Sequence, residues 1–286
     1  MSSATQRVPA AAVARPPEGQ AAAPGAARAA MLEVRGLSKE YRTQSGEGVL
    51  ALERTDMTLD DREFVAILGP SGCGKTTLLK ILAGIVPYEE GDIFFRGAPL
   101  KGPQSGMGIV FQSPVLLPWL TVLENVMLPI RVLGLKRAEY LPRAHDLLTL
   151  VGLADFGNKY PNELSGGMQQ RAAIVRGLIH DPQLLLMDEP FGALDALTRE
   201  RMNVELQRIW LADRKTVFLI THSISEAAFL SDRVLVMSAR PGRIVEEVPV
   251  DFPRPRSIEL MGTAEFGRLT VHLRHLLSSG DGHVDF

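Results

Sequence analysis

A glycine-rich segment, Gly69–Thr76, constrains the fold of this chain more than any other feature. It reads Gly-Pro-Ser-Gly-Cys-Gly-Lys-Thr and lies between an apolar run, residues 64–68, and a segment of helical pattern, residues 76–83. A strand, a glycine-rich turn and a helix in this order form the setting in which the pattern G-x-x-x-x-G-K-S/T binds phosphate. An ordinary glycine-rich turn is the competing interpretation, and the flanking elements favour the phosphate loop. We therefore expect a nucleoside triphosphate site here.

The residue types of this phosphate loop match the chemistry of phosphate binding. Gly69, Gly72 and Gly74 let the backbone curl so that several N–H groups converge on one anion, and the start of the next helix adds to that field. Lys75 supplies a positive charge to the β- and γ-phosphates, and the Thr76 hydroxyl completes the shell of a Mg²⁺ ion. The predicted nucleotide-binding residues of the loop are Gly69, Pro70, Ser71, Gly72, Cys73, Gly74, Lys75, Thr76 and Thr77.

The bulk composition narrows the setting of the protein. Its 286 residues suffice for one large domain or two modest ones, and the formal net charge of −2 gives no support to a nucleic-acid partner. The single cysteine, Cys73, rules out a disulfide framework, which fits a reducing compartment. No apolar run approaches the roughly 18 residues that cross a bilayer. The chain is therefore expected not to span a membrane itself, while docking on a membrane protein stays open.

The N-terminal residues 1–31 differ from the rest of the chain in composition. The first 30 residues contain twelve alanines, four prolines and three arginines, and they lack Leu, Ile and Phe. Such a segment cannot bury enough apolar surface to fold alone, and it has no continuous apolar centre of the secretory type. We expect a disordered tail, with a transit peptide as the alternative.

The apolar pattern from residue 32 onward predicts an α/β domain. Residues 32–34 and 57–59 alternate as half-buried strands do. Helical stretches separate the further expected strands, which are residues 93–95, 107–111, 184–187, 217–220 and 234–237. This alternation is typical of a largely parallel sheet that is covered by helices on both faces.

The sequence pattern changes after Gln112 from expected strands to expected helices. Residues 113–160 have helical periodicity, with a plausible N-cap at Thr121 and a second helix over residues 141–151. The expected breaks are Pro114, Pro118, Pro129 and Pro142. We expect an inserted helical subdomain at about residues 113–163.

A second helical region follows the basic, proline-rich link that opens residues 253–286. Four apolar residues recur there at helical spacing: Phe266, Leu269, Leu273 and Leu276. This stripe either packs back on the domain or contacts a partner or regulator. His272 and His275 lie on the same helix without an acid or cysteine at ligand spacing, so surface imidazoles are expected rather than a metal site.

A buried strand that ends in two carboxylates follows the phosphate loop by about a hundred residues. Leu184–Met187 is apolar, and Asp188 and Glu189 come directly after it. Ligands gather at the carboxyl ends of strands in such sheets. Asp188 is expected to hold Mg²⁺ directly or through water, and Glu189 to polarise the water that attacks the γ-phosphate.

The segment Leu164–Gln169 offers a second anion-binding helix start. Ser165 is a natural N-cap, and Gly166 and Gly167 let backbone N–H groups approach an anion closely. An ordinary capped helix is the alternative. A second such start in a chain with one phosphate loop suggests a site that another subunit completes.

Together these residues resemble the ATP-binding subunits of ABC transporters over roughly residues 32–250. Gly69–Thr76 matches the Walker A loop and Leu184–Glu189 the Walker B strand, and Leu164–Gln169 resembles the signature segment, with Met168 where that pattern has glutamine. The remaining matches are Gln112 for the Q-loop, Ala193–Asp195 for the D-loop, His222 for the switch histidine and Tyr41 for the aromatic that stacks on adenine. The resemblance implies a phosphate-loop NTPase (RecA-like) core with a small antiparallel β-subdomain and an inserted helical subdomain.

The resemblance also implies a mechanism. Two subunits pair head to tail around two ATP molecules, so Ser165, Gly166 and Gly167 of each would contact the nucleotide of the other. Glu189 would be the general base. Gln112 and His222 would contact the γ-phosphate, the attacking water or Mg²⁺. In that scheme Thr76, Gln112 and Asp188 form the metal site, and Asp195 connects the two nucleotide sites.

Smaller signs point to one branch of the family. The segments 117–126, 188–200 and 238–244 are similar to the ATPases of nitrate, sulfonate and taurine importers. Trp119 is either a core residue or part of the groove that receives the membrane subunit. The implied partners are a second copy of the chain, integral-membrane permease subunits and, indirectly, a solute-binding protein. The expected location is peripheral, on the cytoplasmic face of the inner membrane.

Two other classes of protein compete with the importer ATPase. A soluble ABC ATPase of DNA repair or translation usually carries two cassettes or long coiled-coil insertions, and neither is apparent in 286 residues. A nucleotide-gated subunit without turnover would not need both Glu189 and His222.

Overall fold

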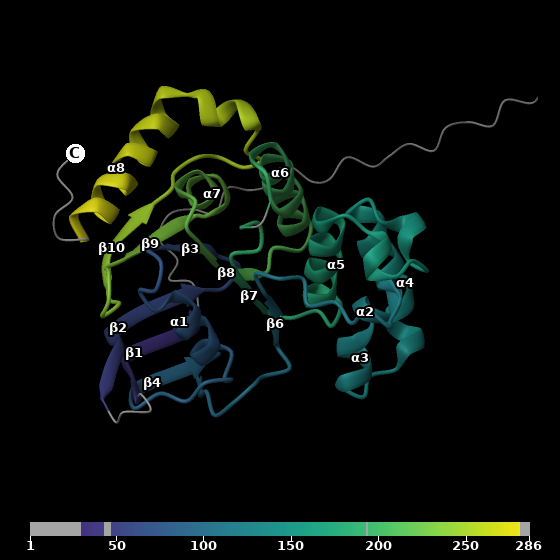
Figure 1. The fold of residues 1–286 in the computed structure, drawn as a ribbon, viewed down its shortest axis with the longest axis horizontal. Coiled ribbons are helices and arrows are strands. Elements are labelled where there is room, and N and C mark those ends of the chain that lie inside the picture. The colour runs from purple at the N-terminus through teal and green to yellow at the C-terminus, as the bar shows by residue number, and fades with distance from the viewer. Residues whose placement is uncertain (1–29, 43–46, 193, 281–286) are drawn as a thin grey trace, which may run out of the picture.

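The computed structural model describes residues 30–42, 47–192 and 194–280, and Figure 1 shows the arrangement of their elements. The predicted N-terminal tail lies outside the described residues except for Ala30 and Met31, which belong to the first strand. Among the described helices, none has the length and apolar character needed to cross a membrane.

A six-stranded sheet forms the centre of the molecule, in the order β10-β9-β3-β8-β7-β6. All neighbours in it are parallel except β10, which runs antiparallel to β9. Its strands are β3 (Phe64–Leu68), β6 (Met107–Val110), β7 (Leu184–Asp188), β8 (Thr216–Thr221), β9 (Arg233–Met237) and β10 (Ile244–Pro249). Every residue of β3, β7 and β8 is buried, as expected for strands that are covered on both faces.

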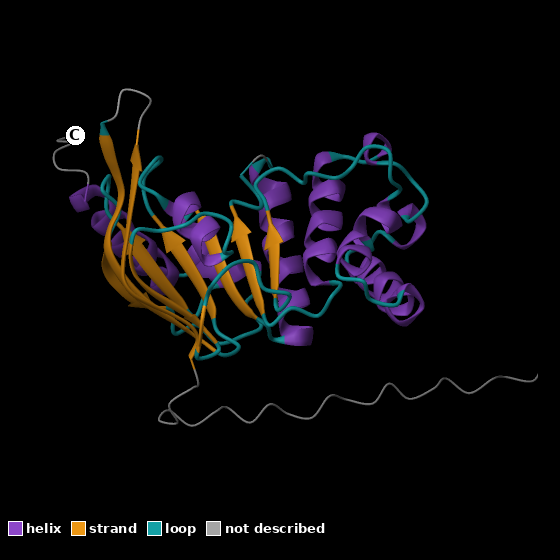
Figure 2. Ribbon diagram, turned by 90° about the horizontal axis from the view of Figure 1, so that it is seen from below, coloured by secondary structure: helices purple, strands orange, loops and turns teal. Residues whose placement is uncertain are grey.

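Successive residues of the central strands enter two different hydrophobic cores, because side chains alternate across a sheet. In β3, Val65 and Ile67 pack with α1 (Lys75–Leu82), whereas Phe64, Ala66 and Leu68 belong to the core on the other face. That other core is built on α5 (Gly166–Leu178), α6 (Ala196–Asp213) and α7 (Ile224–Leu230). Figure 2 shows helices flanking the strands. The predicted α/β core is confirmed.

A smaller antiparallel sheet, in the order β2-β1-β4-β5, covers α1 from outside. Its strands are β1 (Ala30–Arg42), β2 (Gly48–Asp60), β4 (Glu90–Phe95) and β5 (Ala98–Pro99). The first two are far longer than the short stretches predicted from alternation. Register shifts along β1 and β2 interrupt the period of two, so the sequence pattern breaks while the pairing continues. The predicted antiparallel β-subdomain is confirmed.

The inserted helices stand beside the sheets, at the right of Figures 1 and 2. They are α2 (Val122–Val126), α3 (Leu128–Val132) and α4 (Arg137–Leu150), followed by the 3₁₀ turns Ala154–Phe156 and Pro161–Glu163. Thr121 caps α2, and Glu124 completes a reciprocal capping box. The expected break at Pro142 is wrong, because this proline lies inside α4. A single proline removes one intrahelical hydrogen bond, and the helix continues around it.

The C-terminal residues return to the core through a 3₁₀ turn, Ile258–Gly262, and α8 (Ala264–Gly280). Phe266 and Leu273 of α8 are buried in the core that contains α7, so the apolar stripe packs back on the domain. Arg256, only 4% exposed, precedes this segment. Its guanidinium donates to five backbone carbonyls, those of Ala228, Phe229, Ser231, Val250 and Phe252. Burial lowers the pKa of Arg256 to about 10, which leaves it charged near neutrality.

Candidate functional site

The phosphate loop connects the end of β3 to the start of α1. Gly74 is the N-cap of α1 and has φ +109°, a backbone conformation that residues other than glycine rarely adopt. A Cβ atom added there would lie 2.7 Å from the carbonyl oxygen of Ala51 in β2. Glycine is therefore required at Gly74 both by its backbone conformation and by the close approach of β2.

Lys75 and Thr76 begin α1 and turn back toward the loop and the next strand. Lys75 is only 6% exposed. Its ammonium donates to the carbonyls of Gly69 at 2.7 Å and Pro70 at 2.8 Å. The Thr76 hydroxyl lies 3.2 Å from Oδ1 of Asp188 at the end of β7. Burial raises the pKa of the Asp188 carboxyl, and the neighbouring Glu189 raises it further. A cation bound at Asp188 would favour its ionised form.

Three polar side chains meet at the carboxyl ends of β6, β7 and β8. Glu189 follows β7 with φ +43°, and its backbone N–H donates to the carbonyl of Ile220 at 2.9 Å. Its Oε2 atom accepts from Nε2 of Gln112 at 3.3 Å and lies 3.1 Å from Nδ1 of His222. Parallel strands bring these residues together from positions far apart in the chain. The carboxylate is thus oriented from two sides.

The phosphate-loop cleft has a volume of about 370 Å³. Its lining residues are Tyr41, Val49, Ala51, Ser71, Gly72, Gly74, Lys75, Thr76, Thr77, Gln112, Glu189 and Arg240. Tyr41, 41% exposed, has the Lys39 ammonium 5.0 Å from its ring centroid. The sequence pattern predicts most of this lining and assigns no role to Arg240. Cys73, in contrast, is buried against the core and does not line the cleft.

The oxygen donors at this cleft fit Mg²⁺. The Thr76 hydroxyl, the Asp188 carboxylate and the side-chain oxygen of Gln112 are hard ligands, and Thr76 and Asp188 are already neighbours. Mg²⁺ typically takes one or two carboxylates and completes its shell with substrate phosphates and water. Within residues 30–42, 47–192 and 194–280 there is no group of three or more His, Cys, Asp or Glu that could hold a metal.

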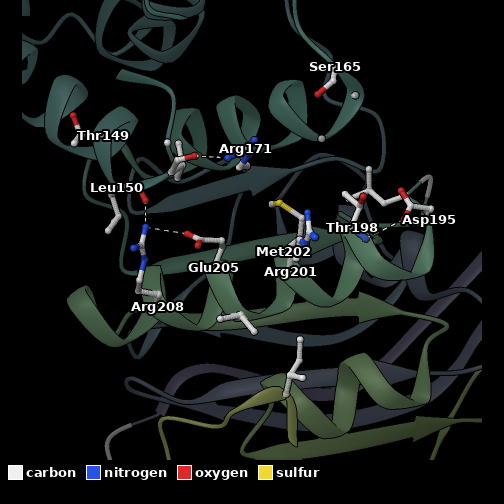
Figure 3. Close-up of a pocket in the computed structure, with 17 residues that line it drawn as sticks. Thr149, Leu150, Ser165, Arg171, Asp195, Thr198, Arg201, Met202, Glu205 and Arg208 are labelled. Carbon is white, nitrogen blue, oxygen red and sulfur yellow. Dashed lines mark hydrogen bonds and ion pairs between the residues drawn. The ribbon is translucent and has the colours of Figure 1, made fainter. Parts of the chain in front are cut away.

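The predicted residues Ser165, Gly166, Gly167 and Asp195 line a different cavity. This signature groove, about 1070 Å³ in volume, lies between α5 and α6 (Figure 3). Ser165 caps α5 by accepting from the N–H of Met168 at 3.4 Å, and Asp195 caps α6 by accepting from the N–H of Thr198 at 3.0 Å. Ala193 of the predicted D-loop lies outside the described residues. Within one chain, the structure does not bring this set to the phosphate loop.

Two arginines of the signature groove donate hydrogen bonds to the end of α4 in the helical subdomain. Arg171 of α5 donates to the carbonyl of Val151 at 2.7 Å. Arg208 of α6 pairs with Glu205 at 2.9 Å and donates to the carbonyl of Leu150 (Figure 3). These bonds satisfy carbonyls at the end of α4, which have no partner within the helix.

A buried carboxyl group lies beside Thr221, the residue before His222. Glu226 of α7 is 3% exposed, and its Oε2 accepts from the hydroxyl of Thr221. Burial raises the pKa of Glu226 to about 7, against the opposing charge of Arg199 on α6. Arg199 in turn donates to the carbonyl of Leu194, beside Asp195. Glu226 is not predicted from the sequence, since nothing in its local pattern distinguishes it from an exposed helical glutamate.

Trp119 lies on the surface of the helical subdomain. It is 69% exposed, and Val115 nearby in sequence is also exposed. The sequence leaves two interpretations of Trp119 open, and the one that places it in the core is therefore wrong. Exposed tryptophan side chains are enriched at surfaces that bind a partner.

The chain is similar in sequence and fold to known proteins of one family. The family model described as ABC transporter matches residues 52–192. A taurine import ATP-binding protein of Rhizobium johnstonii is 46% identical over 256 residues, which cover 87% of this chain and 97% of that protein. An uncharacterized ABC transporter ATP-binding protein of Methanocaldococcus jannaschii is 48% identical over 233 residues, 80% of this chain and 87% of that protein. The dimeric post-hydrolysis structure of the ATP-binding cassette MJ0796 with ADP and Pi superposes with a TM-score of 0.68 at 32% identity, covering 78% of this chain and 100% of that one.

Proposed function

The chain belongs to the family of ABC transporter ATP-binding proteins, and from this premise we propose that it hydrolyses ATP to power an importer of a small solute. It is an ATPase of the ABC type. The observation that carries the catalytic assignment is the Glu189 carboxylate, which Gln112 and His222 orient at the edge of the phosphate-loop cleft.

The predicted site residues have distinct parts in this proposal. Tyr41 stacks on adenine, and the phosphate loop holds the phosphates. The Lys75 ammonium, which donates to the carbonyls of Gly69 and Pro70 in this structure, donates to phosphate oxygens instead when the nucleotide is bound. Thr76, Gln112 and Asp188 would hold Mg²⁺, which neutralises charge on the phosphates when bound. Glu189 accepts the proton of the attacking water on its carboxylate, while Gln112 and His222 keep that carboxylate aligned.

Two copies of the chain are proposed to complete each other's sites. Ser165, Gly166 and Gly167 line a groove separate from the phosphate loop of their own chain, which supports a role at the loop of a second copy. The related cassette MJ0796 was solved as a dimer with ADP and Pi. Asp195, at the start of α6 in the same groove, would connect the paired sites. Binding of ATP at both interfaces would favour closure, and hydrolysis would remove the bridging γ-phosphate.

The transported solute and the membrane partners extend the same proposal. The relative from Rhizobium johnstonii is named for taurine import, which supports a small nitrate-, sulfonate- or taurine-like solute. Permease subunits would dock on the face that carries Trp119, and a solute-binding protein would act through them. The subunit would then lie peripherally on the cytoplasmic face of the inner membrane. A soluble ABC ATPase uncoupled from transport is the second class considered, and the named relatives do not favour it.

Replacing the proposed base tests this function. Glu189→Gln keeps the shape of the side chain and removes its basicity, so ATP turnover should fall by roughly a hundredfold or more while ATP binding persists. The same variant with ATP should accumulate a dimer in size-exclusion chromatography, and adding Ser165→Arg should abolish that dimer. Glu139→Gln, at an exposed position on α4, is the matched control. Unchanged turnover in Glu189→Gln would refute the assignment, and a dimer that survives Ser165→Arg would refute the shared site.

A further inference from the structure

The turn between β9 and β10 packs directly on the phosphate loop. Gly242 of this turn pairs with β2 through two backbone bonds, from its N–H to Ala51 at 3.1 Å and from the N–H of Glu53 to its carbonyl at 2.9 Å. A Cβ atom added to Gly242 would lie 2.0 Å from the carbonyl oxygen of Cys73. Residues 238–244 were notable in the sequence only as a mark of one family branch. The structure places them against the nucleotide-binding turn.

The inside of this turn is held by Ser238. Its backbone N–H donates to the carbonyl of Arg243 at 2.9 Å, and its hydroxyl accepts from the N–H of Arg243 at 3.1 Å. The same hydroxyl is 3.0 Å from the carbonyl of Pro241. The backbone on either side of residue 240 is thus fixed by bonds within the turn as well as by its contact with β2. The position from which Arg240 extends is therefore set before any ligand binds.

Arg240 reaches from this turn to the rim of the phosphate-loop cleft. Its Nε and Nη2 atoms donate to the carbonyl of Gly72 at 3.3 Å and 3.1 Å, and its side chain lines the cleft. Over the part of the chain that the structure describes, Gly72 is the one acceptor recorded for this guanidinium. A guanidinium carries five N–H donors in a planar fork that suits phosphate oxygens. Donors therefore remain for a second partner.

The charge of the cleft favours an anionic partner. Among the described residues that line it, the cations are Lys75 and Arg240, and Glu189 is the acid. Lys75 is almost fully buried, whereas Arg240 is exposed at the rim. Oε2 of Glu189 already has Gln112 and His222 as neighbours. The exposed positive charge on the cleft wall thus comes from Arg240, on a segment that lies 168 residues beyond Gly72 in the chain.

We propose that Arg240 is a further nucleotide-binding residue, whose guanidinium contacts the phosphate chain of the bound nucleotide while it holds the carbonyl of Gly72. This inference rests on the proposed nucleotide site. It adds a contact from outside the phosphate loop, made by a turn that the core of the chain fixes in place. A charge-assisted contact of this kind contributes to affinity and weakens as salt screens it.

The test compares nucleotide affinities of the full chain and two arginine variants. Arg240→Ala should weaken binding of ATP and ADP by about tenfold or more, with a smaller loss for Arg240→Lys, which keeps charge without the fork. Binding of adenosine, which has no phosphate, should not change. Arg243→Ala, an exposed arginine of the same turn, is the matched control and should bind ATP as wild type does. The loss in Arg240→Ala should shrink at high salt.

Several results would overturn the proposal. An equal loss for adenosine would place Arg240 on the sugar or base. Unchanged affinity together with a lower Tm would make it only a brace for Gly72. Unchanged affinity of the monomer with loss of ATP-dependent dimerisation would assign it to the partner subunit. Failure of the wild-type chain to bind ATP at all would refute the nucleotide site itself. This outcome differs from failure of the Arg240 proposal, in which wild type binds ATP and Arg240→Ala binds it equally well.

Discussion

Glu226 makes the stability of this protein depend on pH in a direction opposite to that of most carboxyl groups. The group is buried beside Thr221, whose hydroxyl donates to Oε2, and the structure gives Oε1 no partner among the described residues. Desolvation disfavours its charged form and raises its pKa from 4.5 to about 7. Between these two values the folded protein holds a proton that the unfolded chain has lost.

The sign and size of the effect follow from this difference in proton binding. Stability from the protonated group is fully present below the unfolded pKa of 4.5 and is lost as the pH rises through about 7. Each pKa unit corresponds to about 1.4 kcal/mol, so the free energy of unfolding should fall by about 3 kcal/mol across that window because of this group alone. The nearby Arg199 opposes the shift and Glu189 enhances it.

Glu226→Gln removes this dependence, because glutamine stays neutral and keeps an oxygen that accepts from Thr221. The free energy of unfolding of the variant minus that of wild type should rise by about 3 kcal/mol between pH 4.5 and pH 8.5. Urea unfolding at several pH values, followed by circular dichroism, measures this difference directly. Glu139→Gln on α4 serves as the control. A difference that stays constant with pH would show that Glu226 is ionised normally and that the reasoning is wrong.

Two further predictions concern the C-terminal segment and the helical subdomain. Arg256→Met should destabilise the protein by about 3–5 kcal/mol in urea unfolding and expose α8 to protease, because buried carbonyls lose their donor. Arg274→Met, at an exposed position on α8, is the control. Equal stability of the two variants would contradict the account. Trp119→Ser should leave ATP turnover of the isolated subunit unchanged and abolish co-purification with membrane subunits, because Trp119 is exposed and lies outside the cleft. Intact co-purification would show that this face is not the proposed docking surface.

The sequence predicted those parts of the site that depend on local spacing. The phosphate loop is flanked by β3 and α1, and Asp188 and Glu189 end a fully buried strand, as the apolar runs indicated. Arg240 could not be found in this way, because it reaches Gly72 across 168 residues of chain through packing of a turn. Trp119 was likewise undecided, since exposure depends on which neighbours cover a side chain. The extent of β1 was underestimated where bulges break its alternation.

The phosphate-loop cleft and the signature groove are separate cavities of one chain. In the proposed head-to-tail pair, where one intact site would suffice, mutant alleles of this protein should therefore fall into two complementing groups. Damage to Lys75 would spoil the cleft of a subunit and leave its signature groove able to serve a partner, and damage to Ser165 would do the reverse. In a head-to-tail pair that contains one subunit of each kind, both defects fall on the same site and the other site is intact. Two inactive alleles would then restore function together, whereas two alleles of the same cavity would not.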